Sequence, residues 1–204
     1  MKDVPDHAAA LLKELERHGI LLESDALLPS VVGIVAGGPI RGSWWGHPRG
    51  RDIFAASSRL AEHPDLMVVK LVSGKLTWVH RKLWSALLGV ATSGEPWQRR
   101  GLSALARAVL SRIEKEGEVR TDQLDRPRAV ASKILEERLL VRGEEVHTES
   151  GAHARVLQTW ERWARRAHFS GLPMSPDPAR RAFEEIIHDL KAMHGSKASL
   201  PWER

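Results

Sequence analysis

The sequence predicts a mainly α-helical protein with small β-hairpins, of the α+β class, built from two similar modules and a C-terminal helical extension. Apolar residues recur with helical spacing along most of the chain. Two runs of apolar and β-branched residues flank the turn Ser73-Gly74-Lys75, which is typical of a hairpin. The turn-rich stretch 92–98 separates two passes through the same order of elements. We therefore expect domains at residues 1–95, 99–165 and 166–204.

The composition of the 204 residues excludes several classes of protein. Hydrophobic residues make up 42% of the chain, which is enough for a core, and there is no cysteine for disulfides or thiolate chemistry. No apolar run approaches the ~20 residues of a membrane-spanning helix. The first residues, MKDVPDHAAA, lack the apolar centre of a secretion signal. These features predict a soluble, cytoplasmic protein without membrane contact.

The positive charge is concentrated in the middle of the chain. Residues 1–37 hold 3 basic and 6 acidic side chains, residues 38–107 hold 11 and 4, and residues 108–204 hold 17 and 16. A basic region of this kind favours binding to a polyanion, because each phosphate contact releases condensed counterions. The alternative is a solvated basic surface without a partner.

The first module is expected to contain three helices, a hairpin and a fourth helix. Helices are predicted at residues 7–18, from about 24 to 36, and at 48–62, with a brief extended segment at 20–22. Strands are predicted at 66–72 and 76–80, followed by a helix at 81–90. The inward face of the third helix should carry Ile53, Phe54, Ser57, Leu60 and Ala61. Its outward face should carry Arg49, Arg51, Ser58 and Arg59.

The second module repeats this order. Ser103 is a suitable N-cap for a helix that continues to Glu116, and Gly117 is a suitable stop. A short extended segment at 118–120, a single turn at 121–124 and a third helix at 126–138 follow. The segments 139–142, 146–148 and 155–157 can form a small hairpin. A basic helix at 161–166 and a last amphipathic helix at 179–193 complete the chain, and the tail from Gly195 to Arg204 is expected to be mobile apart from Trp202.

Residues 102–160, LSALARAVLSRIEKEGEVRTDQL–RPRAVASKILEERLLVRGEEVHTESGAHARVLQTW, resemble the winged-helix DNA-binding domains of bacterial regulators. The resemblance covers about a third of the chain and lies in the order and spacing of elements. It implies that the third helix enters the major groove and that the hairpin, or wing, approaches the DNA backbone. Winged helices also serve as protein–protein modules, so the resemblance alone does not separate these two uses.

The candidate nucleic-acid-binding residues follow from this arrangement and from charge. On the third helix of the second module, Val130, Ile134, Leu135 and Leu139 should face the core. The opposite face should then present Arg126, Arg128, Ser132 and Lys133, with Glu136 and Glu137 toward the C-terminus. Arginine suits bidentate guanine recognition, and Ser or Lys can hold phosphates. In the first module the candidates for phosphate contacts are Arg49, Arg51, Arg59, Lys70, Lys75, Arg81 and Lys82.

The most unusual local cluster is Trp44-Trp45 beside His47. Aromatic and guanidinium groups together can stack on a base or bracket a small ligand. The alternative is that these tryptophans close a core, as large aromatic residues in a short connection often do. The tryptophans at 78, 84, 97, 160 and 163 are interpreted as core or interface anchors.

The sequence thus predicts a double-stranded-DNA-binding protein, regulatory in role, without a cofactor. No catalytic motif is present, and the histidine spacings do not indicate a metal site. A DNA-repair glycosylase that uses a cleft near Trp44, Trp45 and Asp52 is one alternative. A scaffold that binds another protein is a second. The last helix is a candidate for homodimerisation or for docking within its own chain.

Overall fold

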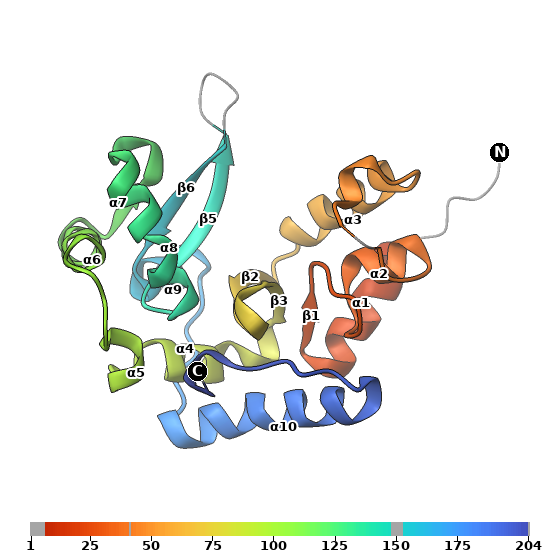
Figure 1. Cartoon of the computed structure of the whole chain (residues 1–204). Helices are drawn as coiled ribbons and strands as arrows, with labels where there is room; N and C mark the ends of the chain where they lie inside the picture. The colour runs from red at the N-terminus through yellow and green to blue at the C-terminus, as the bar shows by residue number, and fades with distance from the viewer. Residues whose placement is uncertain (1–6, 41, 148–152, 204) are drawn as a thin grey trace.

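The structure is a computed structural model that describes residues 7–40, 42–147 and 153–203. Two units of similar construction lie side by side, and α10 (Pro176–His194) runs along one side of the molecule beneath both of them (Figure 1). Helix α4 (Trp84–Ala91) lies between the units and α10 (Figure 1). The predicted α+β class is confirmed by the helices and by two small antiparallel sheets.

The first unit comprises residues 7–80. It begins with α1 (His7–His18), which ends at Gly19 in the left-handed region (φ 79°) and leads directly into β1 (Ile20–Leu22). Strand β3 lies between β1 and β2, so the sheet order is β1-β3-β2. The remaining elements of the unit are α2 (Val31–Ala36), η1 (Trp44–Gly46), α3 (Gly50–Ala61), β2 (Leu66–Lys70), η2 (Val72–Gly74) and β3 (Leu76–His80).

The second unit comprises residues 104–158 and has the same order of strands. Ser103 caps α6 by accepting a hydrogen bond from the backbone N–H of Ala106 at 3.1 Å, as predicted. Strand β6 lies between β4 and β5, which gives the order β4-β6-β5. The elements are α6 (Ala104–Glu116), β4 (Glu118–Arg120), η4 (Thr121–Gln123), α7 (Arg126–Ala131), α8 (Lys133–Glu137), β5 (Arg142–His147) and β6 (His153–Gln158). Each unit is therefore a helix, a strand, further helices and a hairpin.

A shared hydrophobic cluster joins the two units to the C-terminal region. The first unit has a cluster of its own around Leu11, and the second unit has one around Ile113. The third cluster combines residues from all three predicted domains, including Trp84, Trp160 and Phe183. The elements outside the two units are η3 (Arg81–Leu83), α4, α5 (Pro96–Arg99), α9 (Trp160–Arg166), α10 and η5 (Pro201–Glu203).

Helix α4 and the segment before α10 approach each other closely at Gly89. A Cβ built on Gly89 would lie 2.2 Å from the carbonyl oxygen of Met174, so no larger residue fits there without movement. The backbone N–H of Met174 donates to the carbonyl of Ser85 at 2.8 Å. The apolar stripe of α10 is buried on this side, with Phe183 fully covered. The last helix therefore docks within its own chain, which is one of the two arrangements expected for it.

Several segments differ from the sequence-based prediction. The second helix begins at Val31 rather than near residue 24, because the Asp25 carboxylate accepts hydrogen bonds from the N–H groups of Leu27 and Leu28 and forms a turn instead. The predicted linker contains α5. The tail, which was predicted to be mobile, is packed against the protein as far as residue 203, the last that the structure describes, and Leu200 is fully buried.

Candidate nucleic-acid interface

Helix α3 presents a cationic stripe to solvent. Arg51, Ala55 and Arg59 follow one another at intervals of four residues, which places them on one face of the helix, and all three are exposed. Among the described residues, neither arginine side chain has a hydrogen-bond or salt-bridge partner. The buried face of α3 consists of Gly50, Ile53, Ala56 and Leu60.

The corresponding helices of the second unit, α7 and α8, present a similar stripe. Arg126 and Val130 lie four residues apart on α7, Lys133 begins α8, and all three are exposed, with Val130 57% exposed. The side chains of Arg126 and Lys133 also lack a hydrogen-bonding or ionic partner within the described part of the chain. The two units therefore share one feature: the segment before the hairpin exposes two unpaired cations with a small or apolar residue between them.

The prediction of which residues of the helix at 126–138 face solvent is partly wrong. Ser132 is buried, at 2% exposure, and its hydroxyl donates to the carbonyl of Ala129 at 2.8 Å, so it is not available to a phosphate. Instead of continuing one helix through residues 126–138, the chain breaks at Ser132 between α7 and α8. Val130, predicted to face the core, is 57% exposed, and Glu136, predicted to face solvent, is 5% exposed.

Glu136 forms a buried ion cluster between the two units. Its side chain is 5% exposed and accepts hydrogen bonds from Arg155 on β6, at 3.1 and 2.5 Å. Lys70, at the end of β2 in the first unit, lies 3.5 Å from the same carboxylate. Lys70 was predicted to contact phosphate, but it is largely buried and is committed to this cluster.

The other candidates around the first hairpin also have partners inside the protein. The Lys75 ammonium donates to Asp25 at 2.7 Å, and Lys82 donates to backbone carbonyls at the end of α1, including that of Arg17 at 3.2 Å. The Arg81 guanidinium lies over the ring of Trp84, 5.1 Å from its centroid. These three cations were predicted to contact phosphate, but in the structure they make contacts that stabilise the fold.

Electrostatics near Asp25 agrees with this structural role. Although burial by itself favours the neutral acid, the hydrogen bonds from Lys75 and from the Leu28 and Leu27 N–H groups hold the pKa of Asp25 below its ordinary value. The ionised carboxylate is thus stabilised by the same lysine that was predicted to contact DNA.

Two further arginines of the predicted site are partly engaged. Arg49 donates to the Asp52 carboxylate at 3.1 Å and contacts the His7 ring nitrogen at 2.6 Å. Arg128 is exposed and pairs with Asp125, the N-cap of α7. Asp52, the carboxylate considered for base excision, is thus held in an ion pair at the surface, with its side chain 42% exposed.

The Trp44-Trp45 cluster is an exposed aromatic surface. The two rings stack with centroids 4.2 Å apart, and Trp44 packs against the core cluster of the first unit while Trp45 is 67% exposed. Phe54 on α3 lies 5.9 Å from Trp45 and is 55% exposed, although it was predicted to face the core. The Nδ1 of His47 accepts the N–H of Arg49 at 3.2 Å.

The sequence could have identified Phe54 from helical spacing. The core positions of α3 are Ile53, Ala56 and Leu60, and a phenylalanine directly after Ile53 lies at the edge of that stripe. The prediction instead placed Phe54 on the inward face of the helix. By contrast, the prediction that other tryptophans anchor the core is confirmed for those at 78, 84, 160 and 163, which are at most 5% exposed, whereas Trp97 is partly buried.

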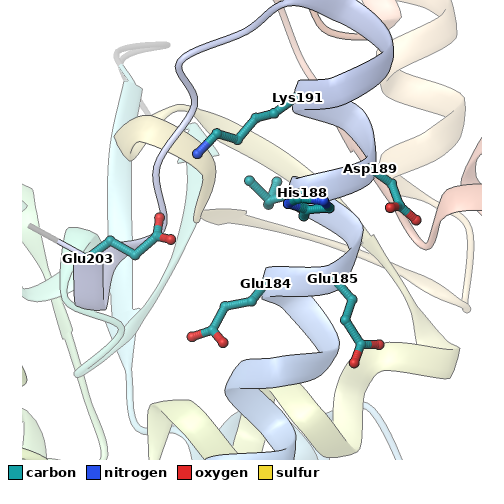
Figure 2. A pocket seen from close by; sticks show the side chains of 7 residues that line it. Glu184, Glu185, His188, Asp189, Lys191 and Glu203 are labelled. Carbon is teal, nitrogen blue, oxygen red and sulfur yellow. The ribbon is translucent and has the colours of Figure 1, made fainter.

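An open pocket beside α10 gathers several charged side chains. Figure 2 shows that Glu185 and Asp189 point away from the side of the helix on which Glu184 and Lys191 lie. Glu184 is already engaged, because it accepts the indole N–H of Trp202 at 2.8 Å. Throughout residues 7–40, 42–147 and 153–203, no three His, Asp or Glu side chains are arranged to hold a metal ion. The cationic stripes and the aromatic surface are therefore the better candidates for a binding site.

Comparisons with known proteins add no further assignment. Within the described residues, no helix combines the length and the apolar character needed to cross a membrane. No protein-family model, no curated protein and no solved structure matches the chain.

Proposed function

We propose that this protein binds double-stranded DNA through two winged-helix units, with α3 and the α7–α8 segment each placed against the duplex. The observation that carries the proposal is the repetition of one arrangement. In both units the second strand of the hairpin lies in the centre of the three-stranded sheet. Both units also expose two unpaired cations on the segment before the hairpin. A winged helix uses this segment to enter the major groove.

The chemistry of the two stripes supports contact with a polyanion. Arg51, Arg59, Arg126 and Lys133 can each exchange a condensed counterion for a phosphate contact. The residue between the cations of α3 is Ala55, whose small side chain lets the helix backbone approach a groove closely. In Figure 1, α3, α7 and the β5–β6 hairpin all lie on the side of the molecule away from α10.

The proposal differs from the sequence-based prediction in the role of the first hairpin. Because Lys70, Lys75 and Lys82 bind groups within the protein, the phosphate contacts of the first unit are assigned to α3. A regulatory role and a homodimer remain part of the proposal. The apolar stripe of α10 is covered by the same chain, so a dimer would use a different surface.

A salt-titrated binding assay on the full chain tests the proposal. We expect fluorescence anisotropy to detect binding to a labelled duplex at low salt, with affinity that falls as salt rises. Replacing Arg51 and Arg59 together with Ala, or Arg126 and Lys133 together, should lower the slope of log K against log salt by about 2 in each double variant.

The matched control removes two exposed cations elsewhere. Arg181 on α10 and Lys197 after it have no side-chain partner in the described parts of the chain. The Arg181→Ala and Lys197→Ala double variant carries the same change in net charge and should leave the slope nearly unchanged. Absence of duplex binding at low salt, or equal losses in all three double variants, would contradict the proposal.

A further inference from the structure

Trp45 offers an open aromatic face at the start of α3. One side of its ring is covered by Trp44, whose centroid is 4.2 Å away with the planes inclined by 21°. Since Trp45 is nevertheless 67% exposed, most of the rest of the ring is open to solvent. Phe54 stands next to it, with centroids 5.9 Å apart and planes inclined by 42°. The two exposed rings form a continuous aromatic surface.

This surface is held in place by the protein beneath it. Trp44 packs against the core of the first unit, and the Ser43 hydroxyl accepts the N–H of Trp45 at 3.4 Å. The loop also lies directly on the first turn of α3. A Cβ built on Gly50 would lie 3.1 Å from the Trp45 carbonyl oxygen, so glycine permits this close approach. The aromatic rings are therefore presented on a fixed support, which lowers the conformational entropy lost when a ligand stacks on them.

An unpaired cation lies beside the aromatic surface. Arg51 precedes Phe54 by three residues on α3, which makes the two side chains neighbours on the helix surface. The nearest acid along this helix, Asp52, is neutralised by its ion pair with Arg49. An aromatic face next to a free guanidinium matches a nucleotide, which has an aromatic base and an anionic phosphate.

We propose that Trp45 and Phe54 form a stacking site for an unpaired nucleobase and that Arg51 contacts the adjoining phosphate. This inference rests on the proposed function, since it places the unpaired base at the end of the duplex segment bound by α3. Arg51 belongs to both features, because it is also the first cation of the α3 stripe. The preferred ligand is thus DNA in which a duplex adjoins a single strand.

The experiment compares three probes with the full chain. These are a blunt duplex, the same duplex with a single-stranded overhang, and the overhang strand alone. The first unpaired position carries 2-aminopurine, whose fluorescence falls when it stacks on an aromatic ring. A reporter in the DNA is needed because the protein has eight tryptophans, and their combined fluorescence would not isolate Trp45.

The wild-type protein is expected to bind the overhang probe about tenfold more tightly than the blunt duplex, with quenching of the analogue. Trp45→Leu keeps an apolar side chain but removes the aromatic face, so the preference and the quenching should both disappear. Trp45→Phe should retain most of both. A purely structural role for Trp45 would not separate the leucine variant from the phenylalanine variant.

Three other outcomes would distinguish the stacking site from the proposed function. Duplex binding without an overhang preference, unchanged in Trp45→Leu, overturns the stacking site and leaves the proposed function standing. Quenching of the single strand that depends on Trp45, without any duplex binding, supports the stacking site and overturns the proposed function. A change of oligomeric state in Trp45→Leu, with unchanged DNA binding, assigns the surface to protein association and overturns the inference.

Discussion

The two hairpins occupy equivalent positions in their units but have different surroundings. In the first, Val72 is fully buried, and the N–H of Ser73 donates to the carbonyl of Ser199 in the C-terminal tail at 2.8 Å. In the second, β5 and β6 extend away from the body of the molecule (Figure 1), and an exposed pair, Glu145 with His153, lies across the strands. The same chain topology therefore gives one hairpin a structural role and leaves the other at the surface.

The difference indicates which features of the repeat are suited to binding. A hairpin can contact DNA only where nothing covers it. The first hairpin is covered by the second unit, at the Lys70–Glu136 contact, and by the C-terminal tail. The second exposes side chains such as Glu145 and His153, but its glutamates disfavour phosphate. The stripes on α3 and on α7–α8 are both exposed and cationic, and they occupy the same position in their units. The proposed DNA contacts are therefore placed on α3 and on α7–α8, and a structural role is given to the first hairpin.

Among the predicted changes, removal of the Glu136 carboxylate should lower the free energy of unfolding the most. Glu136→Ala leaves Lys70 and Arg155 without their shared partner at the junction, and we expect the free energy of unfolding to fall by about 3 kcal/mol. Chemical denaturation measures this loss. The matched variant Glu137→Ala removes a half-exposed carboxylate at the next position and should cost less than about 0.5 kcal/mol. Equal effects of the two substitutions would mean that the cluster does not hold the units together.

A valine in each hairpin gives the next largest effect. Val72→Ala removes two methyl groups from a fully buried site in the first hairpin, and we expect a loss of about 2 kcal/mol. Val146→Ala makes the same change on β5, where the side chain is half-buried, and should cost less than about 1 kcal/mol. The two denaturation midpoints check this directly. A greater loss from Val146→Ala would reverse the assignment of the structural hairpin.

Much of the fold could be predicted from local patterns in the sequence. Helix α1 and strand β1 have the predicted bounds because an apolar stripe, the stop at Gly19 and a short apolar run are all local signals. The N-cap at Ser103 and the stop at Gly117 were predicted for the same reason. Such signals specify the element and its ends without reference to the rest of the chain.

The partners of individual charged residues could not be predicted in this way. Lys70 and Glu136 are far apart in the sequence and meet only because β2 packs beside α8. No periodicity within either segment indicates that contact. Ser132 lies where α7 ends and α8 begins, and the spacing of one helix over residues 126–138 did not indicate its burial. The cationic candidates were therefore recognised by type, whereas their availability required the structure.

The smallest expected effect concerns the aspartates that follow the first strand of each unit. Lys75 holds the pKa of Asp25 below its ordinary value of 3.8, and Arg120 does the same for Asp122 through a hydrogen bond at the surface. Because the pKa of Asp25 is lowered by folding, its ionised form stabilises the fold above pH 3.8, and this contribution is lost as the pH falls below that value. Lys75→Met should raise the pKa of Asp25 and lower stability at neutral pH by about 0.5 kcal/mol, with the two proteins converging in acid.

The matched substitution in the second unit is Arg120→Gln, which should raise the pKa of Asp122. Since this aspartate lies at the surface, we expect a smaller change in acid unfolding than Lys75→Met produces. Carboxyl NMR titration gives both pKa values, and acid denaturation gives both stabilities. An Asp25 pKa that does not move in Lys75→Met would show that the lysine is not committed to this carboxylate. Lys75 would then return to the set of cations available for DNA, and the contrast between the two hairpins would be reduced to the burial of Val72 and Lys70.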